Sequence, residues 1–271
     1  MVRGLDQAAW IGALYATTTF LPISRGGHLA LAELLFDNGH LDDSLQLAFL
    51  VGTLCATGLL IRRTIGAVGI GLVRALQRPS SLVTTAAGRD FLALALAQIP
   101  VAAMSLLAAD VQDKLWGQPM AAAIGFLLST LILLSTAWAM PGEQQQPTAV
   151  QALMLGLGQG LAAFPGLSLT GCTIAMAIWF GLARRRCFEL TLLISMPATL
   201  AAVFRLRAVV HDPDTAMSTL LVGATLTLLV GLVSGKLLRT AVVRGQVAWF
   251  SMWVAPLAIA TLAFARAWPA H

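Results

Sequence analysis

Charged residues are scarce in this chain, since Asp, Glu, Lys and Arg together make up only 11% of it. Soluble domains carry roughly 25% charged residues, whereas 58% of this sequence is hydrophobic and its mean hydropathy is +0.82. This balance excludes an ordinary soluble enzyme or binding domain. It indicates an integral membrane protein.

Cysteine is also rare, and Cys55, Cys172 and Cys187 lie in apolar surroundings without a Cys-x-x-Cys spacing. Neither a disulfide framework nor a zinc site is therefore expected.

The N-terminal region lacks the pattern of a basic segment, a short apolar core and a small-residue cleavage site, because Asp6 and Pro22 interrupt it. We expect no cleaved secretory signal.

Long apolar runs are what the sequence has in abundance. A helical span needs about 20 mostly apolar residues, and these runs lack the period-two alternation of a β-barrel. The candidate spans lie at about 44–61, 90–108, 118–140, 187–207, 216–235 and 247–265. We therefore predict an all-α integral membrane protein with six transmembrane helices.

The basic residues fall into three groups, at 62–89, 184–186 and 236–244. Membrane proteins accumulate Lys and Arg in cytoplasmic loops, so these groups are assigned to the cytoplasmic side. The pI near 9.9 then reflects topology rather than nucleic-acid binding. Acidic loops at 37–43 and near 110 and 212 alternate with the basic groups and are expected outside.

Two further stretches, about 7–36 and 148–182, cannot each cross once without breaking this alternation. Each has Pro and Gly near its middle, where backbone groups must be satisfied by protein or water. We predict two re-entrant helix hairpins, the first opening from outside and the second from the cytoplasm. Residues 1–142 and 143–271 would then form an inverted-topology repeat within one membrane domain, with a substrate site near the midplane.

The alternative for the two stretches is a pair of ordinary spans that Pro and Gly merely kink.

Residues 64–78 are partly apolar and carry Arg74 and Arg78, so they are expected to form a helix at the cytoplasmic interface.

Both predicted hairpins contain Pro followed by Ser-x-x-Gly, in LPISRGGH at 21–28 and in FPGLSLTGCT at 164–173. An arginine at membrane depth costs at least ~2.5 kcal/mol, so Arg25 is expected to face protein, water or an anion. If the hairpin tips meet, hydroxyls, glycine amides and the guanidinium group form an anion cradle. Its expected members are Ser24, Arg25, His28, Ser168, Thr170 and Thr173, with the amides of Gly26, Gly27, Gly166 and Gly171.

A structural role is the competing interpretation of these residues. The hydroxyls could cap broken helices or bond between helices, and His28 could be a buried histidine whose hydrogen bonds are satisfied.

The chain resembles the undecaprenyl-diphosphate phosphatase family. YATTTFLPISRGGH, from Tyr15 to His28, resembles the family motif EGxTEFLPVSSTGH, and PGLSLTGCT, from Pro165 to Thr173, resembles PGxSRSGAT. Further matches are Gln159, Gly181 with Arg184, the run ELTLLISMP from Glu189 to Pro197, Ile99-Pro100 and Val233-Ser234-Gly235. The resemblance implies six spans with two re-entrant hairpins, and a lipid-linked diphosphate processed in the bacterial inner membrane.

The departures from the family fall on its chemistry. Its two motif glutamates correspond to Tyr15 and Thr19, a proposed nucleophilic serine to Arg25, and a proposed phosphate-clamping arginine to Leu169. Without the glutamates the hairpins offer no hard-oxygen cluster for Mg²⁺ or Ca²⁺, so neither a metal nor a cofactor is expected. Tyr15 can donate a hydrogen bond without carrying negative charge, and the positive charge stands at Arg25 on the opposite hairpin.

Three functions follow as hypotheses. The first is a non-hydrolytic carrier or translocase that binds a polyprenyl phosphate or diphosphate. The second is a metal-independent phosphatase with Ser24, Arg25 and His28 as its catalytic residues. The third is other chemistry on a prenyl diphosphate, and an unrelated lipid or drug transporter is a further alternative. The expected ligand-binding residues are Tyr15, Thr19, Gly27, Gly166, Ser168, Thr170, Gly171 and Thr173.

The expected partners are isoprenoid lipids and membrane lipids, not nucleic acid. The sequence leaves open whether two copies of the chain form a homodimer.

Overall fold

The computed structural model describes residues 5–36, 41–108, 111, 114–116, 118–140, 142–210 and 215–267. These residues are almost entirely helical. The helices are α1 (Leu5–Phe20), α2 (Arg25–Phe36), α3 (Asp43–Leu60), α4 (Arg62–Gln77), α5 (Ser81–Thr84), α6 (Ala86–Leu107), α8 (Pro119–Ser135), α9 (Ala149–Gly160), α10 (Leu169–Trp179), α11 (Arg184–Val209), α12 (Met217–Val243) and α13 (Ser251–Ala267), with short 3₁₀ turns at η1 (Thr136–Trp138), η2 (Leu161–Ala163) and η3 (Val247–Phe250).

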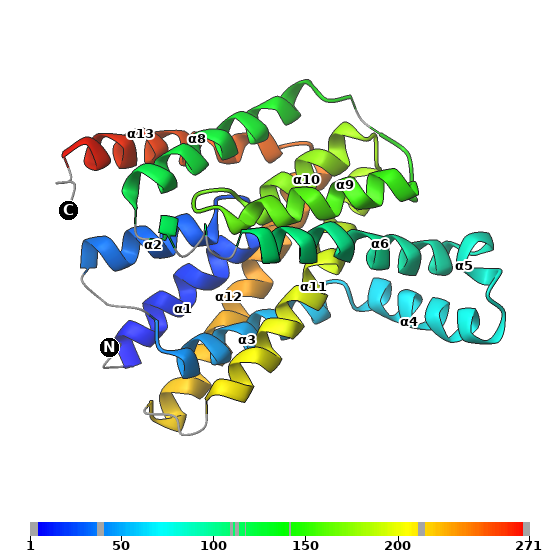
Figure 1. The fold of residues 1–271 in the computed structure, drawn as a ribbon, viewed down its shortest axis with the longest axis horizontal. Helices are drawn as coiled ribbons and strands as arrows, with labels where there is room; N and C mark the ends of the chain where they lie inside the picture. The colour runs from blue at the N-terminus through cyan, green and yellow to red at the C-terminus, as the bar shows by residue number, and fades with distance from the viewer. Residues whose placement is uncertain are drawn as a thin grey trace.

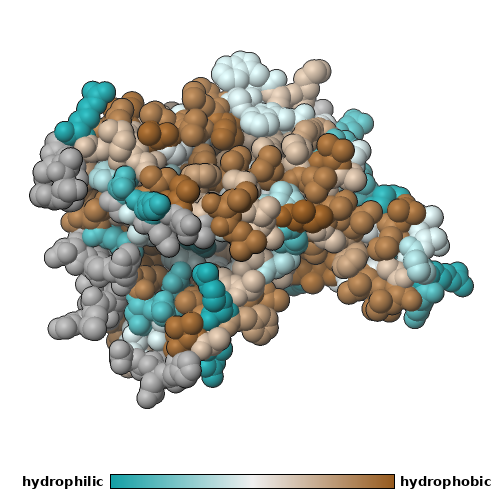
Figure 2. Space-filling model, in the orientation of Figure 1, coloured by the Kyte–Doolittle hydropathy of each residue, from teal (hydrophilic) through white to brown (hydrophobic). Residues whose placement is uncertain are grey.

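Six helical segments within the described residues are long and apolar enough to cross a membrane. They are Asp43–Leu60, Ala86–Leu107, Pro119–Trp138, Arg184–Val209, Met217–Val243 and Val247–Arg266. The predicted all-α class and the six spans are confirmed, and the chain is a multi-pass membrane protein by this architecture. Figure 2 shows that much of one face is hydrophobic, as a surface in contact with lipid tails requires.

A pair of short helices stands at each position where a hairpin is expected. Helices α1 and α2 are joined at 21–24, and α9 and α10 are joined by η2 and residues 164–168. Pro22 and Pro165 lie in these connections, where the missing N–H of proline removes no helical hydrogen bond. Entry of each pair into the membrane from a single face stays a prediction.

Each half of the chain places its short helices against a long helix of the other half. Helix α1 packs on α12 and α9 packs on α6, while α8 packs on α13. A hydrogen bond joins the connection between the halves to the residue before α11, since the Ala183 amide donates to the Gln144 carbonyl oxygen at 2.9 Å. The packing of α1 on the second half and of α9 on the first half is compatible with an inverted repeat. The orientation of this repeat across a membrane stays a prediction.

The helix expected at 64–78 is α4, which runs beside the first part of α6. Gly71 of α4 lies close to the Ala87 backbone, and α4, α5 and the start of α6 project beyond the bundle (Figure 1). The tip of this projection is hydrophilic (Figure 2). Its position at the cytoplasmic interface stays a prediction.

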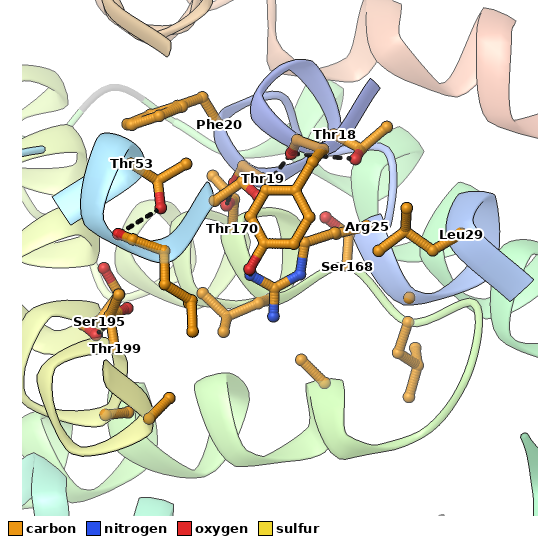
Figure 3. A pocket seen from close by; sticks show the side chains of 18 of the residues that line it. Thr18, Thr19, Phe20, Arg25, Leu29, Thr53, Ser168, Thr170, Ser195 and Thr199 are labelled. Atoms are coloured by element: carbon orange, nitrogen blue, oxygen red, sulfur yellow. Dashed lines mark hydrogen bonds between the residues drawn. The ribbon is translucent and has the colours of Figure 1, made fainter. Parts of the chain in front are cut away.

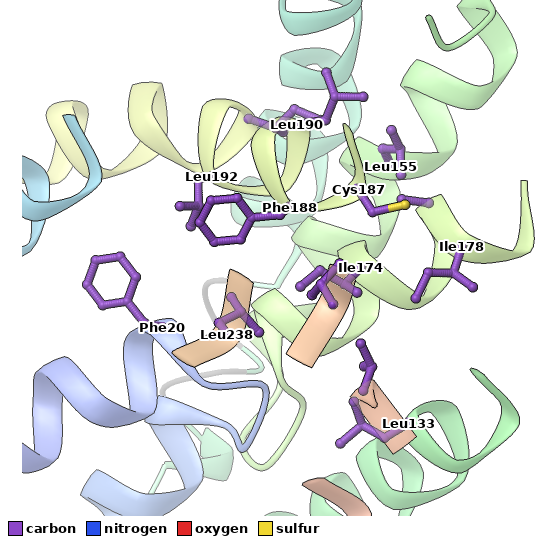
Figure 4. Close-up of a cluster of buried hydrophobic side chains, with 14 of the residues drawn as sticks. Phe20, Leu133, Leu155, Ile174, Ile178, Cys187, Phe188, Leu190, Leu192 and Leu238 are labelled. Carbon is purple, nitrogen blue, oxygen red and sulfur yellow. The ribbon is translucent and has the colours of Figure 1, made fainter. Parts of the chain in front are cut away.

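The main core lies between the hairpin helices and the long spans. Figure 4 shows Phe20 of α1, Ile174 of α10, Phe188 of α11 and Leu238 of α12 gathered in one buried cluster. Helix α11 carries Pro197, and near this proline the side-chain amides of two glutamines, Gln98 and Gln159, donate to the Ile194 carbonyl oxygen at 3.2 and 3.1 Å. Neighbouring helices thus supply hydrogen bonds where proline interrupts the helical pattern.

Candidate functional site

The repeated Ser-x-x-Gly motif caps a helix in both hairpins. The Ser24 hydroxyl oxygen accepts from the Gly27 amide at 3.2 Å at the start of α2, and the Ser168 hydroxyl oxygen accepts from the Gly171 amide at 3.1 Å at the start of α10. Ser24 has a φ of +70°, a left-handed conformation that is rare for serine. The remaining first-turn amides have no intrahelical acceptor, so both helix starts carry partial positive charge.

The two hairpin tips touch each other. The Thr170 hydroxyl donates to the Thr19 carbonyl oxygen at 2.9 Å, and a Cβ on Gly27 would lie 3.0 Å from the Gly166 Cα. Ser129 of α8 holds the second tip, since its hydroxyl donates to the Gly166 carbonyl oxygen at 2.9 Å and accepts from the Ser168 amide at 3.0 Å. These contacts bring residues up to 151 positions apart into one site.

A cavity of about 300 Å³ adjoins the touching tips, and we call it the Arg25 cavity. Its walls come from α1, α2, the 162–170 segment, α3 and α11. Six of the residues expected in the site line it, namely Tyr15, Thr19, Arg25, Gly26, Ser168 and Thr170. Because Thr53 and Ser195 lie near the middle of their spans, the cavity stands at mid-height of the bundle.

Among the described residues that line this cavity, Arg25 carries the one charged side chain. Its guanidinium group donates to the Tyr15 hydroxyl at 3.1 Å and lies 4.9 Å from the centre of the Tyr15 ring. Figure 3 shows it reaching between the hairpin residues and the hydroxyls of Thr53, Ser195 and Thr199. Among the described residues, no carboxylate forms an ion pair with Arg25.

Most hydroxyls around the cavity donate to backbone carbonyl groups. Thr19 donates to the Tyr15 carbonyl oxygen at 2.6 Å, Ser195 to Leu192 at 2.8 Å and Thr199 to Ser195 at 3.0 Å. Their oxygen atoms can still accept hydrogen bonds, but their protons are already donated to these carbonyl groups.

Thr191 of α11 differs from these hydroxyls. It is 1% exposed, it lines the cavity, and its hydroxyl has no hydrogen-bond partner among the described residues. The Ser168 hydroxyl accepts one bond and keeps its proton for another partner. Thr191 and Ser168 can therefore donate to a ligand without breaking a helical bond.

His28 and Ser24 do not line the Arg25 cavity. The His28 Nδ1 atom lies 2.8 Å from the Ser24 carbonyl oxygen, and its Nε2 atom accepts from the Trp253 indole at 3.2 Å. A carbonyl oxygen only accepts and an indole N–H only donates, so this pairing fits a neutral ring protonated at Nδ1. Both ring nitrogens are therefore engaged away from the cavity.

Four other expected site residues also lie outside the cavity lining, and each has a structural contact there. Gly27 and Gly171 donate the capping bonds, Gly166 contacts α8 with a φ of +83°, and the Thr173 hydroxyl donates to the Leu169 carbonyl oxygen at 2.9 Å. Their ligand-binding roles stay predictions.

The cavity does not suit a divalent cation. Mg²⁺ and Ca²⁺ prefer carboxylate oxygens, and the described lining offers hydroxyls and the Gln46 amide but no carboxylate. The positive charge of Arg25 further disfavours a second cation there.

The sequence reasoning missed the wall of the cavity that α3 and α11 form. Thr53 and Thr57 are four residues apart on α3, and Thr191, Ser195 and Thr199 follow the same spacing on α11. This spacing places each set on one helix face. It is the one signal in the sequence that could have indicated them.

Comparison with known proteins agrees with the resemblance seen in the motifs. Undecaprenyl-diphosphatases of Korarchaeum cryptofilum (strain OPF8) and Desulfatibacillum aliphaticivorans are each 29% identical to this chain, over 95% and 90% of it and 98% and 93% of their own lengths. One of Desulforapulum autotrophicum is 30% identical over 73% of this chain and 75% of its own. The family model described as "Bacitracin resistance protein BacA" matches residues 8–260, and the chain therefore belongs to the BacA family.

Proposed function

We propose that this protein binds a polyprenyl diphosphate or phosphate of the bacterial inner membrane, with the phosphate head group in the Arg25 cavity. The relatives are named undecaprenyl-diphosphatases, which makes an isoprenoid diphosphate the natural ligand class. We further propose that the protein acts as a non-hydrolytic carrier or translocase of this lipid.

The observation that carries the proposal is the set of groups that surround the guanidinium group of Arg25. A guanidinium group at membrane depth needs an anion or water, and this one faces hydroxyls and the Tyr15 ring instead of a carboxylate. A phosphate oxygen fits the planar fork of arginine. The starts of α2 and α10 add partial positive charge at the same place.

The remaining lining suits the first carbons of an isoprenoid tail. Leu29, Leu50, Leu192, Ala198 and Ala202 stand beside the polar groups. About 300 Å³ holds a phosphate head group with a short apolar stem, and it lies at the lower end of the volumes usual for ligand pockets.

The arrangement of side chains favours binding over hydrolysis. A general base must come within hydrogen-bond reach of the nucleophile's proton, and the described lining contains neither a histidine nor a carboxylate. Phosphate-ester hydrolysis by Ser24 and His28 would require both side chains to leave their present partners. The metal-independent phosphatase is therefore the second candidate.

The test is reconstitution of the purified protein into liposomes with undecaprenyl diphosphate or undecaprenyl phosphate. Lipid movement between leaflets and release of inorganic phosphate are followed together, with and without divalent cations. We expect lipid binding and movement without multiple-turnover phosphate release. Arg25→Gln should weaken binding by about 10- to 100-fold, the value of a lost charged hydrogen bond.

Arg205→Gln is the matched control, because Arg205 is exposed on α11 and does not line the cavity. Equal binding by the wild type and Arg25→Gln would contradict the site. Sustained phosphate release that His28→Ala abolishes would replace the carrier with the phosphatase.

A further inference from the structure

A second cavity, of about 480 Å³, lies where α3, α4, α11 and α12 meet, and we call it the basic cavity. It shares no lining residue with the Arg25 cavity. Its charged lining consists of Arg62, Arg63, Arg185, Lys236, Arg239 and Glu189. Among the described residues of this lining, cations thus outnumber carboxylates five to one.

The carboxylate of Glu189, which lines the basic cavity, already has partners. Glu189 accepts from Arg185 at 2.8 Å and from Arg186 at 2.8 Å. In the part of the chain that the structure describes, no carboxylate forms an ion pair with Lys236 or Arg239. These two cations, with Arg62 and Arg63, leave the cavity strongly positive.

The start of α4 adds to this charge. Arg62 and Arg63 are its first residues, Ile61 precedes them without a side-chain cap, and the first turn contains no acidic residue. The partial positive charge of the helix start is therefore not neutralised locally.

The basic cavity lies at the ends of three candidate spans. Residues 59–64 include the last two residues of one and the four that follow it, Arg185 lies in the first turn of another, and Lys236 and Arg239 lie in the last turns of a third. Span ends stand at the level of lipid head groups. Beside the cavity, Leu59, Val233 and Leu237 expose 51%, 68% and 54% of their surface, which gives acyl chains an apolar path along α3 and α12.

We propose that the basic cavity binds the phosphate of an anionic phospholipid of the surrounding bilayer. A cationic pocket between transmembrane helices at the head-group level has the charge and position for such a lipid. A soluble anion would use the same cations but not the apolar faces of α3 and α12. The proposal does not depend on the ligand of the Arg25 cavity.

The experiment is native mass spectrometry of the detergent-purified protein titrated with dioleoyl phosphatidylglycerol or dioleoyl phosphatidylcholine. We expect one tightly bound phosphatidylglycerol, with at least tenfold preference over phosphatidylcholine. The double variant Lys236→Gln/Arg239→Gln should bind phosphatidylglycerol at least tenfold more weakly, since each basic residue near an anionic lipid contributes about fivefold. Arg63→Gln provides a second variant with an exposed side chain, should the double variant fail to fold.

The matched control is Arg74→Gln/Arg78→Gln, which removes the same charge from exposed positions outside the cavity. It should change phosphatidylglycerol binding by less than twofold. An equal loss in this control would overturn the site in favour of general surface attraction. Displacement of the lipid by 10 mM inorganic phosphate would overturn the lipid as its occupant.

Discussion

Tyr15 determines how Arg25 presents its charge. The resemblance aligns Tyr15 with a family glutamate, and a carboxylate 3.1 Å from the guanidinium group would neutralise it. The tyrosine instead offers a neutral hydroxyl and the face of its ring, at 4.9 Å from the guanidinium carbon. Phe49 packs against Tyr15, with the two ring centres 5.4 Å apart. The pair therefore orients a cation and leaves its charge available to a ligand.

Thr191→Val tests whether the unpartnered hydroxyl serves a ligand. Burying a hydroxyl without a hydrogen bond costs about 1–3 kcal/mol, so its removal by a side chain of similar shape should stabilise the free protein. We expect the thermal midpoint of the ligand-free protein to rise by a few degrees. Binding of the polyprenyl diphosphate should weaken by about tenfold, as measured by titration on the same preparation.

Thr261→Val is the control for Thr191→Val. Thr261 is 3% exposed, but its hydroxyl donates to the Leu257 carbonyl oxygen at 2.7 Å within α13. This substitution should not raise the thermal midpoint and should leave binding unchanged. A lowered midpoint for Thr191→Val would show that its hydroxyl is satisfied in the free protein.

For single residues, sequence reasoning predicted six of the residues that line the Arg25 cavity, and their ligand-binding roles stay predictions. Polar residues in apolar hairpins are costly, which singled out Arg25, and the guanidinium group of this residue contacts Tyr15 in the structure. The direction of His28 depends on Trp253, 225 positions away, and on the left-handed φ of Ser24. Neither could be read from local spacing.

At the scale of elements, the Ser-x-x-Gly repeat is foremost a capping device. A serine before the helix accepts from the amide three residues later, and the structure has this bond in both hairpins. The other first-turn amides keep no intrahelical acceptor and remain able to donate to a ligand. The capping and ligand-binding interpretations of the motif are therefore compatible.

Gly166→Ala tests how closely the second hairpin tip must approach α8. Gly166 has a φ of +83°, and a Cβ there would clash with the Ala122 carbonyl oxygen. We expect a loss of more than about 4 kcal/mol of stability, since both backbone strain and overlap are introduced. Thermal unfolding and the yield of monodisperse protein provide the measurement.

Gly181→Ala separates the cost of backbone strain from the cost of steric overlap. Gly181 has a φ of +73°, but a Cβ there would meet no atom within 4 Å. Its cost should stay near the 1–2 kcal/mol of left-handed backbone alone. Equal losses in the two variants would mean that the approach of the tip to α8 is unimportant.

In the whole molecule, the long apolar runs made five of the six spans predictable to within a few residues, while the predicted span 216–235 stops eight residues before the end of Met217–Val243. The predicted span at 187–207 corresponds to Arg184–Val209 and that at 247–265 to Val247–Arg266. Packing between the halves was not predictable, because it depends on contacts such as the buried ion pair of Asp90 in α6 with Arg186 in α11, at 2.5 Å. Charged residues at span ends resemble ordinary topological signals until their partners are known.

The orientation of the two halves is the whole-molecule prediction that labelling can test. In a variant without Cys55, Cys172 and Cys187, single cysteines replace Gln118, before α8, or Gln145, in the connection between the halves; both positions are exposed. The basic groups predict Gln118 outside and Gln145 in the cytoplasm. A membrane-impermeant maleimide should therefore label Gln118→Cys in intact bacterial cells, and Gln145→Cys only after permeabilisation. Labelling of both from outside would contradict the inverted repeat, because the second hairpin then could not open from the cytoplasm.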